Sequence, residues 1–140
     1  MTWNASSPAM GNQIANDIPD ILENFLHLRP TVTAKTANYT LVAADLLGNT
    51  IFTNYGASAQ INFTWPALAA NQRCMFRVEA AKGFMITAPA GKTFNYMSQE
   101  GAAAGTVLCS TVGNAIEFVA VTDASSLGVV SIIGAWTYSE

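Results

Sequence analysis

Side chains that could carry out chemistry are few and widely spaced in this chain. His27 is the only histidine, and Cys74 and Cys109 are the only two cysteines. A single imidazole excludes metal sites that need two or more histidines. A nucleophile and base made of Cys74 and His27 would lack a third orienting group, and the sequence around Cys74 has no glycine-rich elbow. The sequence therefore predicts no catalytic residue, no bound metal and no cofactor, so we expect the protein not to be an enzyme.

The acidic residues likewise do not indicate a catalytic or metal site. Four of them stand singly in predicted strands and loops, with no spacing that pairs two carboxylates, and turn or solvated roles suffice for them: Glu79, Glu100, Glu117 and Asp123. Asp45 is isolated before Leu46, Leu47 and Gly48, where a carboxylate can accept backbone amides and fix a turn. A calcium ion would need several oxygen ligands, and none cluster near Asp45.

Aromatic side chains provide one alternative, which is recognition of a sugar. Trp136 and Tyr138, near the C-terminus, are the candidates for stacking on a glycan, while Trp65 is expected in the core. The loops expected to help are residues 67–72, 95–105 and 122–127. We therefore keep a glycan-binding module as an alternative function.

Charge is scarce along the whole chain. Charged residues make up 11% of the 140 residues, against roughly 25% in a typical soluble domain. Asp45 is the only charged residue between Lys35 and Arg73, and no Lys or Arg follows Lys92. There is no basic stripe to neutralise phosphates, so nucleic-acid binding is not expected.

Membrane insertion and export are not predicted either. No apolar run approaches the ~20 residues that span a bilayer. The first twenty residues lack the basic start and apolar stretch of a signal peptide, so we expect the mature chain to begin near Met1. Cys74 and Cys109 lie in apolar, strand-like segments, and without a secretory signal buried free thiols are favoured over a disulfide.

Residues 1–30 differ from the rest and are predicted to form a separate docking segment. Asp17 can cap a short helix, Pro19 fits its first turn, and Pro30 ends it. His27 lies in the expected last turn, where capping is the simpler role. Apolar residues at spacings of three and four form a stripe that a partner must cover: Ile14, Ile18, Ile21, Leu22, Phe25 and Leu28.

From Thr31 onward the apolar pattern changes to period two. In "QINFTW", Ile61, Phe63 and Trp65 point to one face of a strand, and Asn62 and Thr64 point to the other. Strands are predicted at residues 31–35, 39–42, 50–55, 61–65, 74–80, 84–87, 106–111, 115–122 and 129–133, punctuated by glycine and proline turns. The prediction is a mainly β domain over residues 31–140, an antiparallel β-sandwich or small jelly-roll-like barrel, preceded by one short N-terminal helix.

Several of these strands are apolar on both faces. The segments "IEFVAV" and "VVSII" do not alternate as a strand with one face in water should. A second buried surface is therefore expected. Together with the scarcity of charge, this predicts contact with other copies of the same chain around a symmetry axis.

The order of residues also carries a family resemblance. "YTLVAADLLGNTIFTNYGASAQINFTWP" resembles the opening of small β-rich modules in tailed-bacteriophage fibres, spikes and appendages. "GFMITAPAGKTF" resembles the hairpin of that module, and Gly134-Ala135-Trp136 resembles the Gly-x-Trp element of its closing strands. The resemblance covers about residues 31 to 140. Trp65 stands where such modules more usually have leucine.

The resemblance implies a structural role in a virion, assembly as a homotrimer, and no catalytic residues. Residues 1–30 are similar to the attachment ends of such proteins, which dock onto other virion proteins. The expected function is a short trimeric fibre, decoration or adaptor protein whose β-domain projects outward. The alternative stays a module that binds a glycan on the host surface. A depolymerase is disfavoured because it needs paired acids in a groove.

Overall fold

A computed structural model describes residues 30–96 and 99–139 of the chain. All strands in these ranges belong to the unit Thr31–Glu140, which is the predicted β-domain. The predicted N-terminal helix, its six stripe residues (Ile14, Ile18, Ile21, Leu22, Phe25 and Leu28) and His27 lie outside the described residues.

The described residues form twelve strands and one short 3-10 turn, η1 (Ala43–Leu46). The strands are β1 (Thr31–Ala34), β2 (Tyr39–Thr40), β3 (Leu47–Thr53), β4 (Ile61–Thr64), β5 (Arg73–Arg77), β6 (Phe84–Thr87), β7 (Thr93–Tyr96), β8 (Gln99–Glu100), β9 (Thr106–Cys109), β10 (Ala115–Ala120), β11 (Ser126–Ile133) and β12 (Thr137–Tyr138). A strand lies within or across each of the nine predicted segments. The strands β7, β8 and β12 were not predicted.

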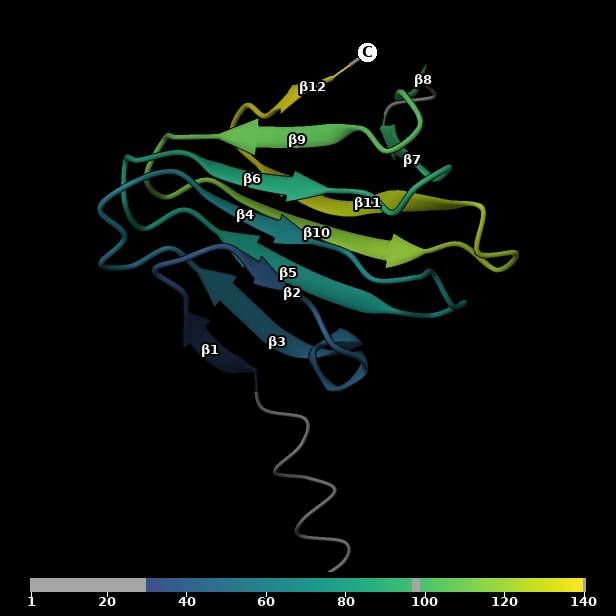
Figure 1. Cartoon of the computed structure of the whole chain (residues 1–140), viewed down its shortest axis with the longest axis horizontal. Helices are drawn as coiled ribbons and strands as arrows, with labels where there is room; N and C mark the ends of the chain where they lie inside the picture. The colour runs from purple at the N-terminus through teal and green to yellow at the C-terminus, as the bar shows by residue number, and fades with distance from the viewer. Residues whose placement is uncertain (1–29, 97–98, 140) are drawn as a thin grey trace, which may run out of the picture. The chain divides into compact units, whose positions relative to one another are not determined.

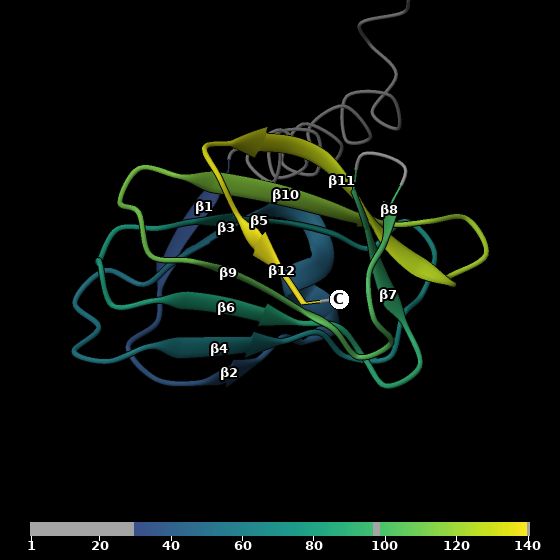
Figure 2. The same cartoon turned by 90° about the horizontal axis from the view of Figure 1, so that it is seen from above.

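The strands form two sheets that face each other (Figure 2). One sheet has seven strands in the order β1-β3-β5-β10-β11-β7-β8, and the other has five in the order β12-β9-β6-β4-β2. The described sheets do not close into a barrel, because each ends in two different edge strands. The expectation of a mainly β fold is thus confirmed, and the barrel alternative is wrong.

The prediction of purely antiparallel sheets is also wrong, because both sheets are mixed. From β1 to β6 the chain alternates between the sheets, so successive strands of one sheet run in the same direction. The pairings β1–β3, β3–β5, β2–β4 and β4–β6 are all parallel (Figure 1). Turn signals show where a strand ends, but not whether the next strand returns beside it or crosses to the other sheet. That distinction decided the topology.

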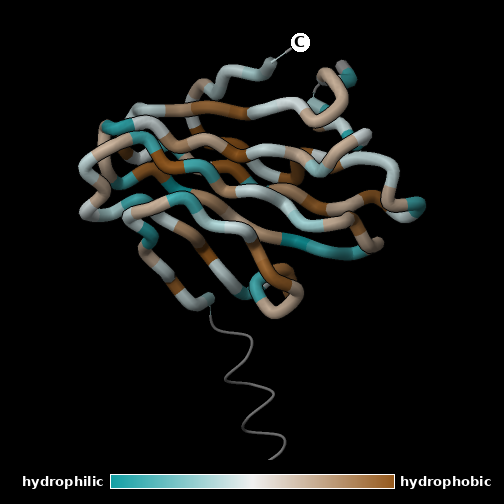
Figure 3. The backbone as a smooth tube through the Cα atoms, in the orientation of Figure 1, coloured by the Kyte–Doolittle hydropathy of each residue, from teal (hydrophilic) through white to brown (hydrophobic). Residues whose placement is uncertain are grey.

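Aromatic rings fill the space between the sheets. Phe76 on β5 packs edge-on against Phe63 on β4 and Phe84 on β6, with ring centroids 5.5 and 5.7 Å apart. Phe63 and Phe84 stack at 4.8 Å, and all three side chains are fully buried. Hydrophobic stretches accordingly follow the strands, while many turns are hydrophilic (Figure 3). Inter-sheet aromatic contacts of this kind stabilise a core beyond the area they bury.

Asp45 fixes the turn before β3, as the sequence predicted. Its carboxylate accepts the backbone amide of Val42 at 2.9 Å and the hydroxyl of Tyr39 at 3.0 Å. The hydrogen bond from Tyr39, with burial and the negative charge of Asp45, raises the pKa of that tyrosine above its usual value. This isolated charge therefore serves the local structure of the turn.

Candidate functional site

The outer face of the seven-stranded sheet is the first candidate site. Strand register places Val32, Ile51 and Met75 side by side across β1, β3 and β5. In the flanking rows, Leu47 lies beside Arg73 and Val119 on one side, and Ile133 lies beside Ala115 and Arg77 on the other. We use the name apolar face for six side chains: Val32, Leu47, Ile51, Met75, Val119 and Ile133.

Much of the apolar face is open to solvent. The exposed fractions of Leu47, Val32 and Ile133 are 75%, 62% and 60%. Val130, exposed to 49%, lies beside it where β11 bulges past Glu117 and Phe118. The sequence predicted a second buried surface for "IEFVAV" and "VVSII", and Val119, Val130 and Ile133 from these segments lie at this face. Exposed apolar side chains gathered on one face of a sheet typically mark an interaction site.

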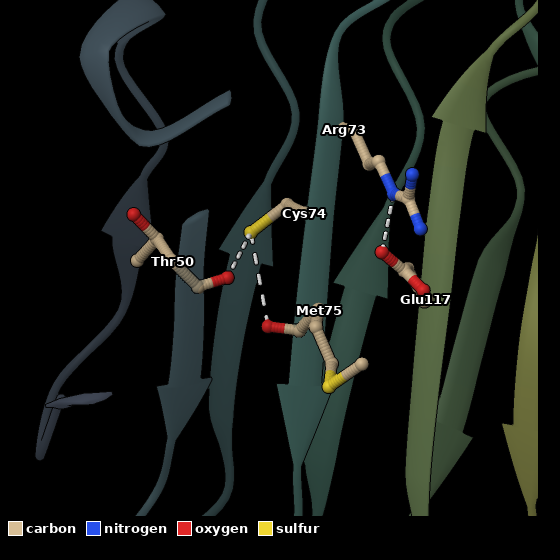
Figure 4. A network of polar contacts seen from close by, with 5 residues as sticks. All are labelled: Thr50, Arg73, Cys74, Met75 and Glu117. Carbon is tan, nitrogen blue, oxygen red and sulfur yellow. Dashed lines mark hydrogen bonds and ion pairs between the residues drawn. The ribbon is translucent and has the colours of Figure 1, made fainter. Parts of the chain in front are cut away.

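One ion pair crosses the apolar face. The guanidinium of Arg73 on β5 donates a hydrogen bond to the carboxylate of Glu117 on β10 (Figure 4). Glu117 retains 7% exposure, so the expectation of a solvated or turn role for this residue is wrong. Its neighbours across the sheet, Met75 and Ser131, flank it on both sides. Burying the carboxylate of Glu117 costs little free energy only while the guanidinium of Arg73 stays beside it.

Cys74 lies beside this ion pair but points away from it, toward the carbonyl oxygen of Thr50 (Figure 4). Its side chain is fully buried, and burial raises the pKa of the thiol far above its usual value. A thiol held protonated is a poor nucleophile and a poor metal ligand. Cys74 and Cys109 are both free and buried, which confirms the prediction of free thiols.

A cavity of about 710 Å³ lies between the β7–β8 hairpin and β12, and is the second candidate site. These strands terminate the two sheets near one edge of the domain (Figure 1). The described lining residues are Phe94, Tyr96, Glu100, Gly101, Ala102, Tyr138 and Ser139. The volume falls within the roughly 300–1,000 Å³ of typical small-molecule sites.

Two tyrosines from different sheets meet in this cavity. The rings of Tyr96 and Tyr138 stack with centroids 5.0 Å apart and an angle of 6°. The buried hydroxyl of Tyr138 has no hydrogen-bond partner among the described residues. Burial, and secondarily the neighbouring Tyr96, raises the pKa of Tyr138 to about 12. Tyr138 therefore stays a neutral hydrogen-bonding group at ordinary pH.

Trp136 and Tyr138, the two residues predicted for glycan stacking, are in different environments. Trp136 retains 9% exposure, packs edge-on against Phe84, and donates its indole N–H to the carbonyl oxygen of Ile133 at 3.3 Å. It serves the core and does not offer an open ring face. Tyr138 alone of the pair lines the cavity.

Tyr96 and Glu100 also line the cavity. From the sequence, Glu100 was expected in a solvated or turn role, and Tyr96 was only one of several aromatic residues available for stacking on a sugar. Both fall within residues 95–105, which were predicted to form a ligand-binding loop, yet Tyr96 lies on β7 and Glu100 on β8. The short period-two signal of Phe94 and Tyr96 was the one local indication of a strand. The loop 122–127 borders a smaller hollow of about 500 Å³, whose described lining contains no aromatic residue.

Membrane-spanning helices and metal sites are both absent from the described residues. No helix among them is long and apolar enough to cross a bilayer. The same part of the chain contains no group of three or more His, Cys, Asp or Glu side chains arranged to hold a metal ion.

Comparison with known proteins leaves the family resemblance without further support. No family model matches the chain, and no curated protein matches it either. The likeness to bacteriophage appendage modules rests on the residues quoted for it and stays a prediction.

Proposed function

We propose that the protein is a structural subunit of a bacteriophage virion, a short trimeric fibre, decoration or adaptor protein. In this proposal the apolar face joins copies of the chain, and residues 1–30 dock the trimer onto another virion protein. The observation that carries the proposal is the apolar face itself. Its six apolar side chains lie on neighbouring strands, of which β3, β5, β10 and β11 already contribute buried residues to the core.

The energetics of the apolar face favour association. Leu47, Val32 and Ile133 keep more than half of their surface exposed, and fully burying such a side chain contributes ~1.5–3 kcal/mol. Association must offset roughly 4–15 kcal/mol of lost rotational and translational freedom. Several of these side chains must be buried together, which a face extending from β1 to β11 allows.

The ion pair on this face also suits an interface. Glu117 is already largely withdrawn from water and paired with Arg73, so covering it with a second copy desolvates a neutralised group. An unpaired charge there would oppose assembly at a cost of several kcal/mol. Arg77, with a side chain exposed to 57%, approaches Glu79 at 3.9 Å at the rim. Paired charges in this arrangement permit contact and help to orient the partner.

The mass of the full chain in solution, measured by light scattering, tests the proposed assembly. We expect three times the monomer mass of 14.8 kDa. The change Ile133→Asp places an unpaired charge in the apolar face and should yield monomers, since an uncompensated charge buried in an interface is costly. A circular dichroism spectrum like that of the unchanged protein would show that the variant remains folded.

Val112→Asp is the matched control. Val112 is exposed to 56%, close to the 60% of Ile133, but lies in the turn between β9 and β10, outside the apolar face. This variant should remain trimeric. A monomeric wild-type chain, or a trimer that survives Ile133→Asp, would contradict the proposal.

A further inference from the structure

The cavity between the β7–β8 hairpin and β12 has walls held by the backbone. The amide of Gly101 donates to the carbonyl oxygen of Phe94 at 2.8 Å, and the amide of Ser139 donates to the carbonyl oxygen of Thr106 at 2.9 Å. The hydroxyl oxygen of Ser139 accepts the amide of Thr106 at 2.6 Å. The amide of Ala102 also donates to the carbonyl oxygen of Ser139 at 3.5 Å, so the two walls are tied to each other as well as to their own sheets. The site is therefore formed before a ligand arrives.

Small residues let the two walls lie close to each other beside the cavity. A Cβ atom added at Gly101 would lie 3.3 Å from the carbonyl oxygen of Phe94 and 3.6 Å from that of Ser139. The first distance is tighter than ordinary van der Waals contact. Glycine at this position thus lets the two backbones approach, and Ala102 beside it projects only a methyl group.

The polar groups of the cavity favour a neutral ligand. Glu100 is the one charged residue among its described lining residues. It is exposed, and one carboxylate oxygen accepts the hydroxyl of Thr93 at 3.1 Å, which leaves the second oxygen able to accept further hydrogen bonds. A carboxylate with spare acceptor capacity attracts hydroxyl and amide hydrogens and repels anions. No described lining residue supplies a cation that would offset a ligand's negative charge.

The stacked tyrosines supply the apolar part of the site. Tyr96 and Tyr138 lie parallel, so together they present a flat aromatic pair. The hydroxyl of Tyr138 is enclosed without a partner in the described part of the chain, and such a group costs ~1–3 kcal/mol. A polar group of a ligand that reaches this hydroxyl would supply the missing hydrogen bond and remove the cost.

We propose that this cavity binds a neutral, hydroxyl-rich ring, such as one uncharged sugar residue of a glycan. The tyrosine pair packs against the ring, and Glu100 accepts its hydroxyl hydrogens. The site is distinct from the apolar face, and ligand binding here does not depend on self-association.

Protein NMR on the full chain tests this site. The neutral probes are methyl glucopyranoside, methyl galactopyranoside and N-acetylglucosamine, and glucuronic acid is the charged comparison. We expect at least one neutral probe to bind with a Kd of about 1 mM. Its ring protons should show saturation transfer from the protein, and amide shifts should change at Gly101, Ala102 and Ser139. Glucuronic acid should cause much smaller changes because Glu100 repels it.

Two variants and one control make the test specific. Glu100→Gln changes an exposed side chain, keeps its shape and should weaken binding about tenfold, the loss expected for one charge-assisted hydrogen bond. Tyr96→Ala should abolish binding. Tyr55→Ala removes a tyrosine exposed to 68% in a distant turn and should leave binding unchanged.

Three results would overturn the proposal. The first is that no neutral probe shifts the cavity amides at roughly 10 mM, well above the expected Kd. The second is equal affinity in the wild-type protein and in Glu100→Gln. The third is a set of shift changes that maps to the hollow at Thr122, Asp123 and Ser126 instead. Light scattering on the same samples reports the trimer separately, so failure here is distinguishable from failure of the proposed assembly.

Discussion

At the residue scale, the domain depends on a few polar side chains that hold loops to strands. Asn54 follows β3 and is completely buried. Its side-chain oxygen accepts the amides of Glu79 and Ala80 at 2.7 and 2.8 Å, and its side-chain nitrogen donates to the carbonyl oxygen of Ala80 at 2.7 Å. One carboxamide thus fixes the connection between β5 and β6, and buried polar groups of this kind are costly to leave unpaired.

We predict that Asn54→Ala destabilises the protein by about 2–4 kcal/mol, because three backbone groups lose their partner in a largely enclosed site. Urea unfolding followed by circular dichroism measures the free energy of unfolding. The control is Asn38→Ala, whose exposed carboxamide oxygen accepts the amide of Asn62 at 2.9 Å and whose loss should cost about 1 kcal/mol or less. Equal losses in the two variants would show that the buried carboxamide has no special role.

At the scale of the elements, the join between β11 and β12 requires a glycine. Gly134 has a φ of +78°, and a Cβ there would lie 2.1 Å from the side-chain oxygen of Asn114. Asn114 cannot move freely, since its side-chain nitrogen donates to the carbonyl oxygen of Ala135 at 3.1 Å. This turn directs Trp136 into the core and brings Tyr138 to the cavity.

We predict that Gly134→Ala destabilises the domain by several kcal/mol, from backbone strain together with the clash. Gly113→Ala is the matched comparison. Its φ of +93° imposes similar strain, but a Cβ there meets nothing within 4 Å, so the loss should be about 1 kcal/mol. Thermal unfolding of both variants measures the difference. If both variants lose the same free energy of unfolding, the clash with Asn114 adds nothing to the cost of the substitution.

At the scale of the whole molecule, the proposed function assigns separate roles to two parts of the chain. Self-association is assigned to the apolar face of the β-domain, and attachment to the particle is assigned to residues 1–30. The domain carries few charges, so electrostatic repulsion between two copies is too weak to prevent their apolar faces from meeting. Disrupting each of the two parts separately therefore tests this assignment of roles.

We predict that a chain of residues 31–140 folds and forms the same trimer but no longer joins the particle. Phe25→Asp in the full chain should act in the same way, because a charge in the covered stripe costs several kcal/mol. Sedimentation of assembled particles with immunoblotting of the particle fraction measures attachment, and light scattering measures the trimer. Particles that incorporate the truncated chain normally would refute the docking role.

The candidate sites show how far the sequence could be interpreted. The repeat of period two predicted the strands because alternation depends only on neighbouring residues. It did not reveal that Glu117 is buried, since the covering partner, Arg73, is 44 positions away in the chain. Likewise Tyr96 and Tyr138 meet across two sheets, and no local signal relates residues so distant in sequence.

The sequence alone determined the β class, the buried free thiols, the turn at Asp45 and the unusual lack of charge. These features depend on residue type and local spacing. The tertiary structure alone decided that β1 to β6 alternate between two sheets, that Trp136 belongs to the core, and that an apolar face and a tyrosine-lined cavity exist. Each of these depends on which strands become neighbours, and that is set by the packing of the whole core and not by any one segment.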